Sequence, residues 1–228
     1  MKELDKYRYE RKLYVVDLDE HEIEMLIKLH PAMFSEIYYA RFVNNIYLDT
    51  FRMDSYFANV DGLTERAKFR VRWYGDLFGL IEKPVLEVKR KQGLLGIKEA
   101  CAIAPFVLDH HFNTDRMMEA FKESALPEHL RMHLYGLDVS LLNRYKRKYF
   151  QSFDRKYRIT LDSQMSYHEI RGQDNTFLNK SIDRNGTIVE VKYDAKNHDH
   201  VESILNHFPV RVTKCSKYVT GKDSLLSW

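Results

Sequence analysis

The chain has 228 residues, of which 44% are hydrophobic and 30% charged, with 36 Lys and Arg against 33 Asp and Glu. These values predict a globular chain with a sizeable core and exclude disordered, collagen-like and disulfide-rich classes. Because no apolar run is long enough to span a bilayer and the chain starts without a secretion signal, we expect a cytoplasmic protein with no membrane segment. We expect Cys101 and Cys215 to remain thiols. The net charge of +3 identifies no binding partner, so any indication of a partner has to come from how the charges are distributed along the chain.

Helical periodicity is limited to a few short segments. A capping-box pattern at Asp19 predicts a first helix that ends before Pro31, and Thr114 is expected to cap a second. Two further helices are predicted within residues 126–135 and 201–208, where apolar residues recur with helical spacing.

The remaining periodic segments are predicted strands, because they are rich in β-branched and aromatic residues and alternate with a period of two. They are Tyr7–Val16, Asn45–Thr50, Ala67–Tyr74, Val85–Lys91, Ile97–Ala102, Leu142–Phe153, Lys156–Leu161, Thr187–Tyr193 and Thr213–Thr220. Short connections and the absence of a linker or repeat predict a single domain over residues 1–228. Its expected class is α+β, mainly β, with an antiparallel barrel or sandwich and a few short helices.

Residue parity within these strands shows a charged face. Successive side chains in a strand point to opposite faces, so Phe69 and Val71 share one face and Arg70 and Arg72 the other. Other strands repeat this division, and bases outnumber acids on the polar side. Its bases are Arg8, Lys12, Arg70, Arg72, Lys89, Arg147, Arg158, Lys192 and Lys217, and its acids are Glu10, Asp49, Glu87, Asp162 and Glu190.

A solvated face would explain the polar residues of any one strand. The set as a whole uses Arg at more than half of its basic positions, and the guanidinium fork suits bidentate contacts with phosphate. Glu10, Glu87 and Glu190 each lie two residues before a Lys, which indicates oxygen ligands for a hard cation beside phosphate-binding bases. If the sheet closes around this face, a phosphate chain with Mg²⁺ or Mn²⁺ would offset the repulsion among the bases. We expect no nucleic-acid partner.

Several motifs occur in an order that resembles a known family. They are Arg8-Tyr-Glu10-Arg-Lys12, Asn45-Ile-Tyr47-Leu-Asp49, Lys68-Phe-Arg70-Val-Arg72-Trp-Tyr-Gly75, Glu87-Val-Lys89, Tyr145-Lys-Arg147, Arg158-Ile-Thr-Leu-Asp162, Glu190-Val-Lys192 and Ser216-Lys217-Tyr218. Together they resemble the vacuolar transporter chaperone (VTC) polyphosphate polymerase domain of the triphosphate tunnel metalloenzyme (CYTH-like) superfamily. The resemblance implies a closed antiparallel eight-stranded β-barrel, a triphosphate tunnel, with short helices packed outside. It also implies a metal-dependent transferase that moves the γ-phosphoryl group of ATP to a polyphosphate chain.

The resemblance assigns roles to particular residues. By motif position, the implied catalytic tunnel bases are Lys12, Arg70, Arg72, Lys89, Arg147 and Lys217, and Glu190 is the implied metal ligand. Parity adds Arg8, Arg158 and Lys192 as phosphate-binding residues, and Glu10 and Glu87 as metal ligands. The expected cofactor is Mn²⁺ or Mg²⁺, and the expected ligands are ATP and inorganic polyphosphate or triphosphate. The oligomeric state stays open.

One departure separates branches of the resembled superfamily. Tunnel triphosphatases carry Glu-x-Glu-x-Lys on the first strand, whereas this chain has Arg8 at the first position. The lost carboxylate favours the polymerase. Two alternatives stay open: hydrolysis of tripolyphosphate or a nucleoside triphosphate, and binding of polyphosphate or another polyanion without catalysis.

Overall fold

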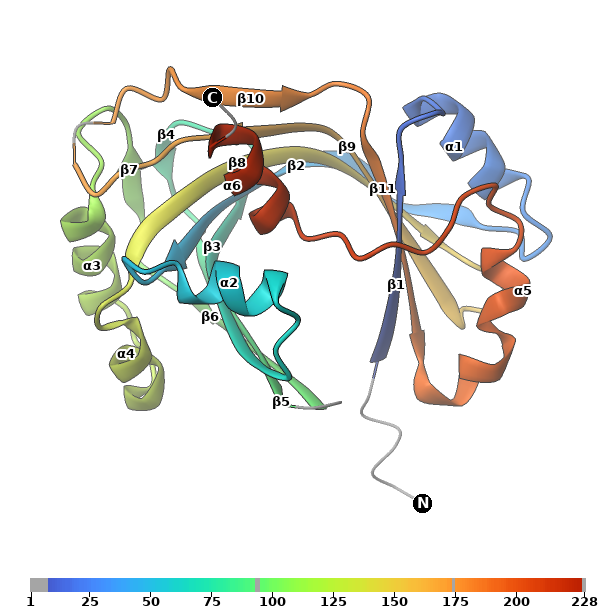
Figure 1. Ribbon diagram of the computed structural model, residues 1–228, viewed down its shortest axis with the longest axis horizontal. Helices are drawn as coiled ribbons and strands as arrows, with labels where there is room; N and C mark the ends of the chain where they lie inside the picture. The colour runs from blue at the N-terminus through green and yellow to red at the C-terminus, as the bar shows by residue number, and fades with distance from the viewer. Residues whose placement is uncertain (1–7, 93–94, 174, 227–228) are drawn as a thin grey trace. The chain divides into compact units, whose positions relative to one another are not determined.

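The computed structural model describes residues 8–92, 95–173 and 175–226, which form two compact units (Figure 1). Unit 1 consists of Met1–Arg41, Tyr145–Met165 and Asp183–Cys215, and unit 2 of Phe42–Arg144, Ser166–Ile182 and Ser216–Trp228. Each unit combines three separate stretches of the chain, so neither is a continuous half of the sequence. The expectation of a single domain over residues 1–228 stays a prediction.

Strands dominate the described part of the chain. They are β1 (Arg8–Val15), β2 (Ser35–Asp49), β3 (Glu65–Tyr74), β4 (Gly79–Ile81), β5 (Val85–Gln92), β6 (Leu95–Ala102), β7 (Phe106–Leu108), β8 (Asp138–Gln151), β9 (Tyr157–His168), β10 (Lys180–Asp183) and β11 (Thr187–Asp194). The helices are α1 (Glu20–Lys28), α2 (Asp54–Val60), α3 (Thr114–Lys122), α4 (Glu128–Leu134), the 3₁₀ helix η2 (Ala195–His200), α5 (Val201–Leu205) and α6 (Lys217–Leu226). None of the helices in the described ranges has the length and apolar character needed to cross a bilayer.

The strands form a nine-stranded sheet with the hydrogen-bonded order β1-β11-β9-β8-β2-β3-β5-β6, in which β10 also pairs with β9. A small second sheet joins β4 to β7. The ladders with a described register are antiparallel, which confirms the predicted mainly β, antiparallel class. The order begins at β1 and ends at β6, and no ladder between these two is found among the described residues. Closure into an eight-stranded barrel therefore stays a prediction.

Unit 1 has a core on one face of β1, β11 and β9. Leu13, Val191 and Ile159 are fully buried there, and α1 and α5 pack against them through Ile27 and Ile204. The predicted capping box of α1 is confirmed, since the side chain of Asp19 accepts two backbone N–H groups and its own N–H donates to Glu22. The polar residues of these strands consequently occupy the opposite face.

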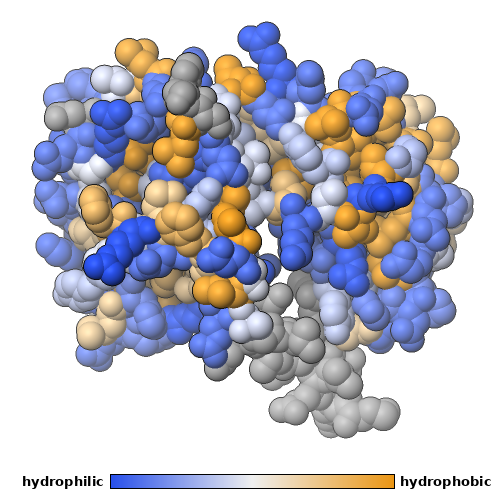
Figure 2. Space-filling model, in the orientation of Figure 1, coloured by the Kyte–Doolittle hydropathy of each residue, from blue (hydrophilic) through white to orange (hydrophobic). Residues whose placement is uncertain are grey.

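Unit 2 has a second core on the apolar face of β3 and β5. Val71 and Leu86 are fully buried in it, and α3 and α4 cover it with Met117 and Leu130 (Figure 1). The predicted cap of α3 was wrong by one residue, because Asn113 is extended and its side chain accepts the backbone N–H of Arg116 at 2.9 Å. Hydrophilic side chains cover most of the face seen in Figure 2, as expected when the apolar faces are buried.

One predicted strand was wrong. Thr213–Thr220 does not form a strand: Val212 makes an isolated bridge with Leu13, and α6 begins at Lys217. The aromatic and β-branched residues Tyr218 and Val219 favour a strand by propensity. Tertiary packing decides otherwise, because Tyr218 is buried in unit 2 as part of a helix.

Other elements were missed or predicted too short. Strand β2 begins ten residues before the predicted Asn45. The prediction missed this first half because it is mostly exposed and lacks apolar alternation. Strand β9 continues to His168, and the short elements α2, β4, β7 and β10 gave no clear periodic signal.

Gly221 of α6 lies against buried side chains of unit 2. A Cβ at this position would meet the ring of Tyr167 and lie 2.6 Å from Cδ2 of Leu141. We expect Gly221→Ala to destabilise the protein in a urea titration, because overpacking costs about 1–3 kcal/mol and helix propensity returns only about 1 kcal/mol. Gly172→Ala is the control, since the nearest atom to its Cβ would be Thr114 Oγ1 at 3.5 Å. Equal stability of the two variants would contradict this account.

Candidate functional site

The polar face of unit 2 carries a group of bases around one carboxylate. In the ladder between β3 and β5, Arg70 pairs with Glu87 and Lys68 pairs with Lys89, and Lys98 of β6 pairs with Lys89. Directly paired residues share a face. Phe69, Val71 and Trp73 point to the core instead, as parity predicted.

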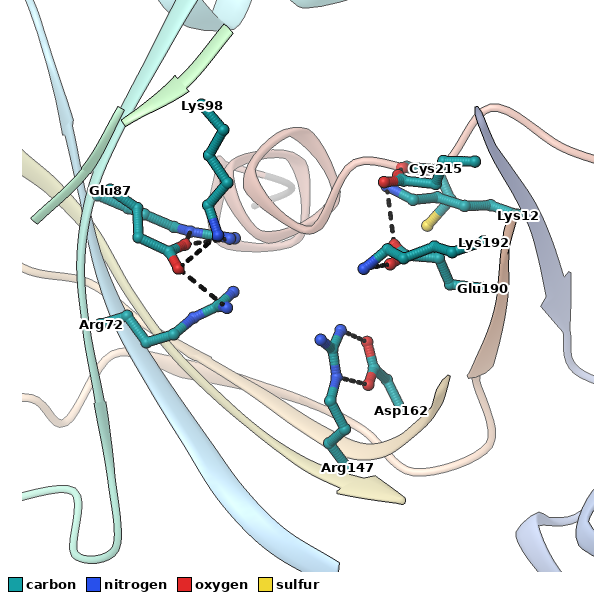
Figure 3. Close-up of polar contacts among 11 residues, drawn as sticks. Lys12, Arg72, Glu87, Lys98, Arg147, Asp162, Glu190, Lys192 and Cys215 are labelled. Carbon is teal, nitrogen blue, oxygen red and sulfur yellow. Dashed lines mark hydrogen bonds and ion pairs between the residues drawn. The ribbon is translucent and has the colours of Figure 1, made fainter. Parts of the chain in front are cut away.

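Glu87 is the acceptor for three cations, as Figure 3 shows for Arg72 and Lys98. Its Oε2 accepts from Nε and Nη2 of Arg70 at 2.8 and 2.5 Å, and its Oε1 lies 2.9 Å from Nζ of Lys98 and 3.5 Å from Nη1 of Arg72. The Glu87 side chain is 10% exposed. Burial alone would raise the pKa of Glu87, but the charges of Arg70 and Arg72 and the Lys98 bond outweigh it and lower the pKa to about 2.

Arg72 is held by a relay of buried amides. Its Nε donates to Oδ1 of Asn45 at 3.0 Å, and Nδ2 of Asn45 donates to Oδ1 of Asn143 at 2.9 Å. Both asparagines are fully buried. The guanidinium orientation is therefore fixed by β2 and β8 as well as by Glu87.

Helix α6 adds to the same unit at the edge of this face. Tyr218 donates to Oδ2 of Asp49 at 2.6 Å, and Asp49 also accepts backbone N–H groups from the start of α2. Lys68 donates to Oγ of Ser216 at 3.0 Å and lies 5.3 Å from the ring centre of Tyr47. Lys217 is thus carried by the first turn of a helix rather than by the predicted strand, and its role as a tunnel base stays a prediction.

The polar face of unit 1 is built from rows that cross three strands. In one row Glu10 pairs with Lys192, which pairs with Arg158. In the next row Lys12 pairs with Glu190, which pairs with Thr160. Acids and bases therefore alternate along and across β1 and β11. Arg158, on β9, is exposed.

Glu190 is a buried acid of this face, with a side chain only 7% exposed (Figure 3). It forms ion pairs with Lys192 and, at 3.5 Å, with Lys12. Lys12 also lies 2.8 Å from Glu10 and donates to the backbone oxygen of Cys215. Burial lowers the pKa of Lys12, but the negative charges of Glu190 and Glu10 raise it by more than burial lowers it. Lys12 is therefore a permanent cation.

Arg147 of β8 lies beside this group in a bidentate pair. Its Nε and Nη2 donate to the two carboxylate oxygens of Asp162 at 2.5 and 2.7 Å, and Asp162 is fully buried. Burial lowers the pKa of Arg147, while the charge of Asp162 raises it well above its ordinary value. Arg147 is therefore neutralised by a permanent partner.

Of the other residues expected at the site, Lys89 is exposed on the polar face of unit 2, and the side chain of Arg8 lies outside the described residues. The roles of all these residues stay predictions. Sequence reasoning missed Lys98, which the parity of β6 places on the same face as Lys89. It also missed the Asn45 and Asn143 relay, for which a single sequence holds no signal.

The ion pairs of Glu87 predict a pH dependence of stability. Because its pKa is about 2 in the folded chain and near 4.5 ordinarily, its contribution is present above pH 4.5 and is lost as the pH falls toward 2. Urea unfolding of Glu87→Gln should show a loss of about 3–4 kcal/mol at pH 7, since one pKa unit corresponds to about 1.4 kcal/mol. The difference from the unsubstituted chain should shrink below pH 4.5. Glu82→Gln, at an exposed position of unit 2, is the control, and a difference that does not change with pH would disprove this account.

Comparisons with known proteins identify the family through a family model and the fold through solved structures. The model of the VTC domain family matches residues 7–226. A comparison with curated proteins finds no match. Among solved structures, a candidate adenylate cyclase from Vibrio parahaemolyticus is 13% identical with a TM-score of 0.53, and covers 97% of this chain and 98% of its own.

Two further structures share the fold at similar identity. A candidate adenylyl cyclase from Hippeastrum, described with a dominant triphosphatase activity, is 14% identical with a TM-score of 0.55, covering 95% of this chain and 96% of its own. A protein from Pyrococcus horikoshii is 16% identical with a TM-score of 0.50, covering 92% and 96%. At such identities the likeness shows the fold alone. The family model spans nearly the whole chain, and the chain therefore belongs to the VTC domain family.

Proposed function

We propose that the protein is a metal-dependent polyphosphate polymerase, which transfers the γ-phosphoryl group of ATP to an inorganic polyphosphate chain. Membership of the VTC domain family supports this proposal. Closure of the strand order into a tunnel is part of it and rests on the family. A cytoplasmic location, expected from the sequence, is also part of the proposal.

The observation that carries the proposal is the state of Glu87 and Glu190. Each is a poorly exposed carboxylate that serves as counter-ion to several bases. Such an arrangement keeps cations ordered before a substrate arrives, and phosphate oxygens can then take the place of the carboxylates. Arg70 and Arg72 suit this exchange, because a guanidinium can bind two phosphate oxygens at once.

The reaction needs little covalent help from the protein. An oxygen at the end of the phosphate chain forms a bond to the γ-phosphorus of ATP. The bond from that phosphorus to the oxygen that bridges the β- and γ-phosphates breaks, and ADP leaves with the electron pair of this bond. Arg70 and Arg72 of unit 2 would bind equatorial and bridging oxygens and so help to hold donor and acceptor in line. Removing one such contact typically costs about 3–4 kcal/mol of transition-state stabilisation.

The donor set fits a hard divalent cation with few protein ligands. No group of three His, Cys, Asp or Glu side chains able to hold a metal exists within the described ranges. Mg²⁺ and Mn²⁺ are commonly held by one or two carboxylates together with substrate phosphates, so Glu190 and Glu10 suffice on the protein side. When bound, the cation would neutralise charge on the phosphate oxygens. We propose Glu87 separately, as a metal ligand on the polar face of unit 2.

Hydrolysis of tripolyphosphate or of a nucleoside triphosphate is the second candidate. The triphosphatase activity described for the Hippeastrum protein of the same fold favours it. Arg8, in place of a carboxylate on β1, favours the polymerase. Binding of a polyanion without turnover is the remaining outcome, and would show strong salt dependence.

Incubation of the purified chain with ATP and Mn²⁺, followed by sizing of the phosphate products, tests the proposal. Chains that lengthen while ADP accumulates support the polymerase. Free phosphate as the product, or binding without turnover, overturns it.

Arg70→Ala and Arg72→Ala should each abolish synthesis without unfolding the chain, because Glu87 keeps two of its three cationic partners in either variant. The measurements are product formation and the thermal midpoint. Arg116→Ala, which removes an exposed base of α3, is the matched control and should retain activity. A large loss of stability in both β3 variants would speak against a ligand role.

Glu190→Gln should shift the Mn²⁺ activation curve to higher concentration, because the amide keeps the shape of the side chain but loses its charge. Activity is measured across a Mn²⁺ series at saturating ATP. An activation curve that matches the unsubstituted chain would remove Glu190 from the metal site.

A further inference from the structure

The hydroxyl of Thr160 is a buried polar group that makes no hydrogen bond within the described part of the chain. Its oxygen has no hydrogen-bond partner among the described residues, and the residue is only 7% exposed. Buried hydroxyl groups are ordinarily bonded, because an unmade hydrogen bond costs free energy. Its place within unit 1 indicates what would satisfy it.

Thr160 lies directly opposite Glu190 in the ladder between β9 and β11. Opposite residues in an antiparallel ladder have Cβ atoms about 5 Å apart and point to the same face. On β9, Arg158 and Asp162 occupy the same face two residues to either side, and Asp162 already binds Arg147. Of these two neighbouring carboxylates, that of Glu190 is directly opposite Thr160 and is paired with lysines, one of which, Lys192, has a side chain that is 37% exposed.

We propose that Thr160 is a direct ligand, through its hydroxyl oxygen, of the divalent cation that Glu190 binds. This inference rests on the proposed function and names a residue for which the sequence predicted no role, although it lies within the motif Arg158-Ile-Thr-Leu-Asp162. A carboxylate and a neutral hydroxyl are both hard oxygen donors, which suit Mg²⁺ and Mn²⁺. Oxygens of the bound phosphate chain would supply the remaining ligands of the cation.

A cation satisfies this pair better than a phosphate group does. A phosphate placed between Thr160 and Glu190 would face a carboxylate and be repelled by it. A cation there would be attracted to Glu190 and would use the unpaired hydroxyl. It would also release Lys12 and Lys192, the present partners of Glu190, to bind phosphate oxygens.

Calorimetry with two probes tests the assignment on the full chain. The probes are the preformed complex of Mn²⁺ with tripolyphosphate, and tripolyphosphate alone in the presence of EDTA. Thr160→Val keeps the shape of the side chain and removes its oxygen, so we expect affinity for the Mn²⁺ complex to fall about tenfold while affinity for metal-free tripolyphosphate is unchanged. Thr160→Ser, which keeps the hydroxyl, should bind the complex within about threefold of the unsubstituted chain.

The controls separate a ligand from a structural residue. Because the Thr160 hydroxyl bonds to none of the residues that the structure describes, Thr160→Val should unfold at no lower temperature than the unsubstituted chain. Ser163→Ala removes another buried hydroxyl of β9, one that donates to Glu20 at 2.7 Å, and should lower stability while leaving both affinities intact. Full affinity of Thr160→Val for the Mn²⁺ complex, equal losses for both probes, or failure of Thr160→Ser to restore binding would each overturn the proposal.

The outcome is separable from that of the proposed function. Mn²⁺-dependent binding that requires Thr160, without polyphosphate synthesis, would refute the polymerase and keep the ligand assignment. Synthesis by the unsubstituted chain, with unchanged binding by Thr160→Val, would refute only the assignment.

Discussion

The polar faces depend on ion pairs between poorly exposed carboxylates and the bases that surround them. Glu87 neutralises Arg70 and Arg72, and Glu190 neutralises lysines of β1 and β11. Without these carboxylates, like charges in a poorly solvated space would repel and the strands that carry them would be destabilised. The sheet can therefore hold a dense set of bases only because acids of the same face alternate with them.

The ion pairs differ in how readily an anion could replace the carboxylate. Asp162 is fully buried and accepts from Nε and Nη2 of Arg147, so two of the five N–H donors of that guanidinium are committed to this carboxylate. Lys98 and Lys192 have side chains that are 54% and 37% exposed, and they can swing toward a phosphate with little loss of packing. The pair at Arg147 thus resembles a structural brace, and the pairs at Glu87 and Glu190 resemble exchangeable counter-ions.

The sequence predicted the faces of the strands but not the contacts made by distant residues. Parity alone separated Arg70 from Phe69 correctly, because the period of a strand is fixed by its backbone. The strand predicted around Tyr218 was wrong, because Tyr218 lies in a helix that is anchored by a hydrogen bond to Asp49, 169 residues away in the sequence. Thr160 escaped notice because a threonine in a strand looks ordinary, and only burial without a partner distinguishes it.

The proposed metal and phosphate sites are coupled by the counter-ions they share. A cation bound to Glu190 would displace Lys12 and Lys192 from that carboxylate, so that Lys12 would keep Glu10 and Lys192 would be available to phosphate. Phosphate would in turn offset the positive charge that repels the cation. Each ligand would therefore bind more tightly in the presence of the other, and linkage requires the two effects to be equal. An arrangement of this kind discriminates against phosphate without metal and against metal without phosphate, which is the selectivity that an enzyme of metal-bound phosphate chains requires.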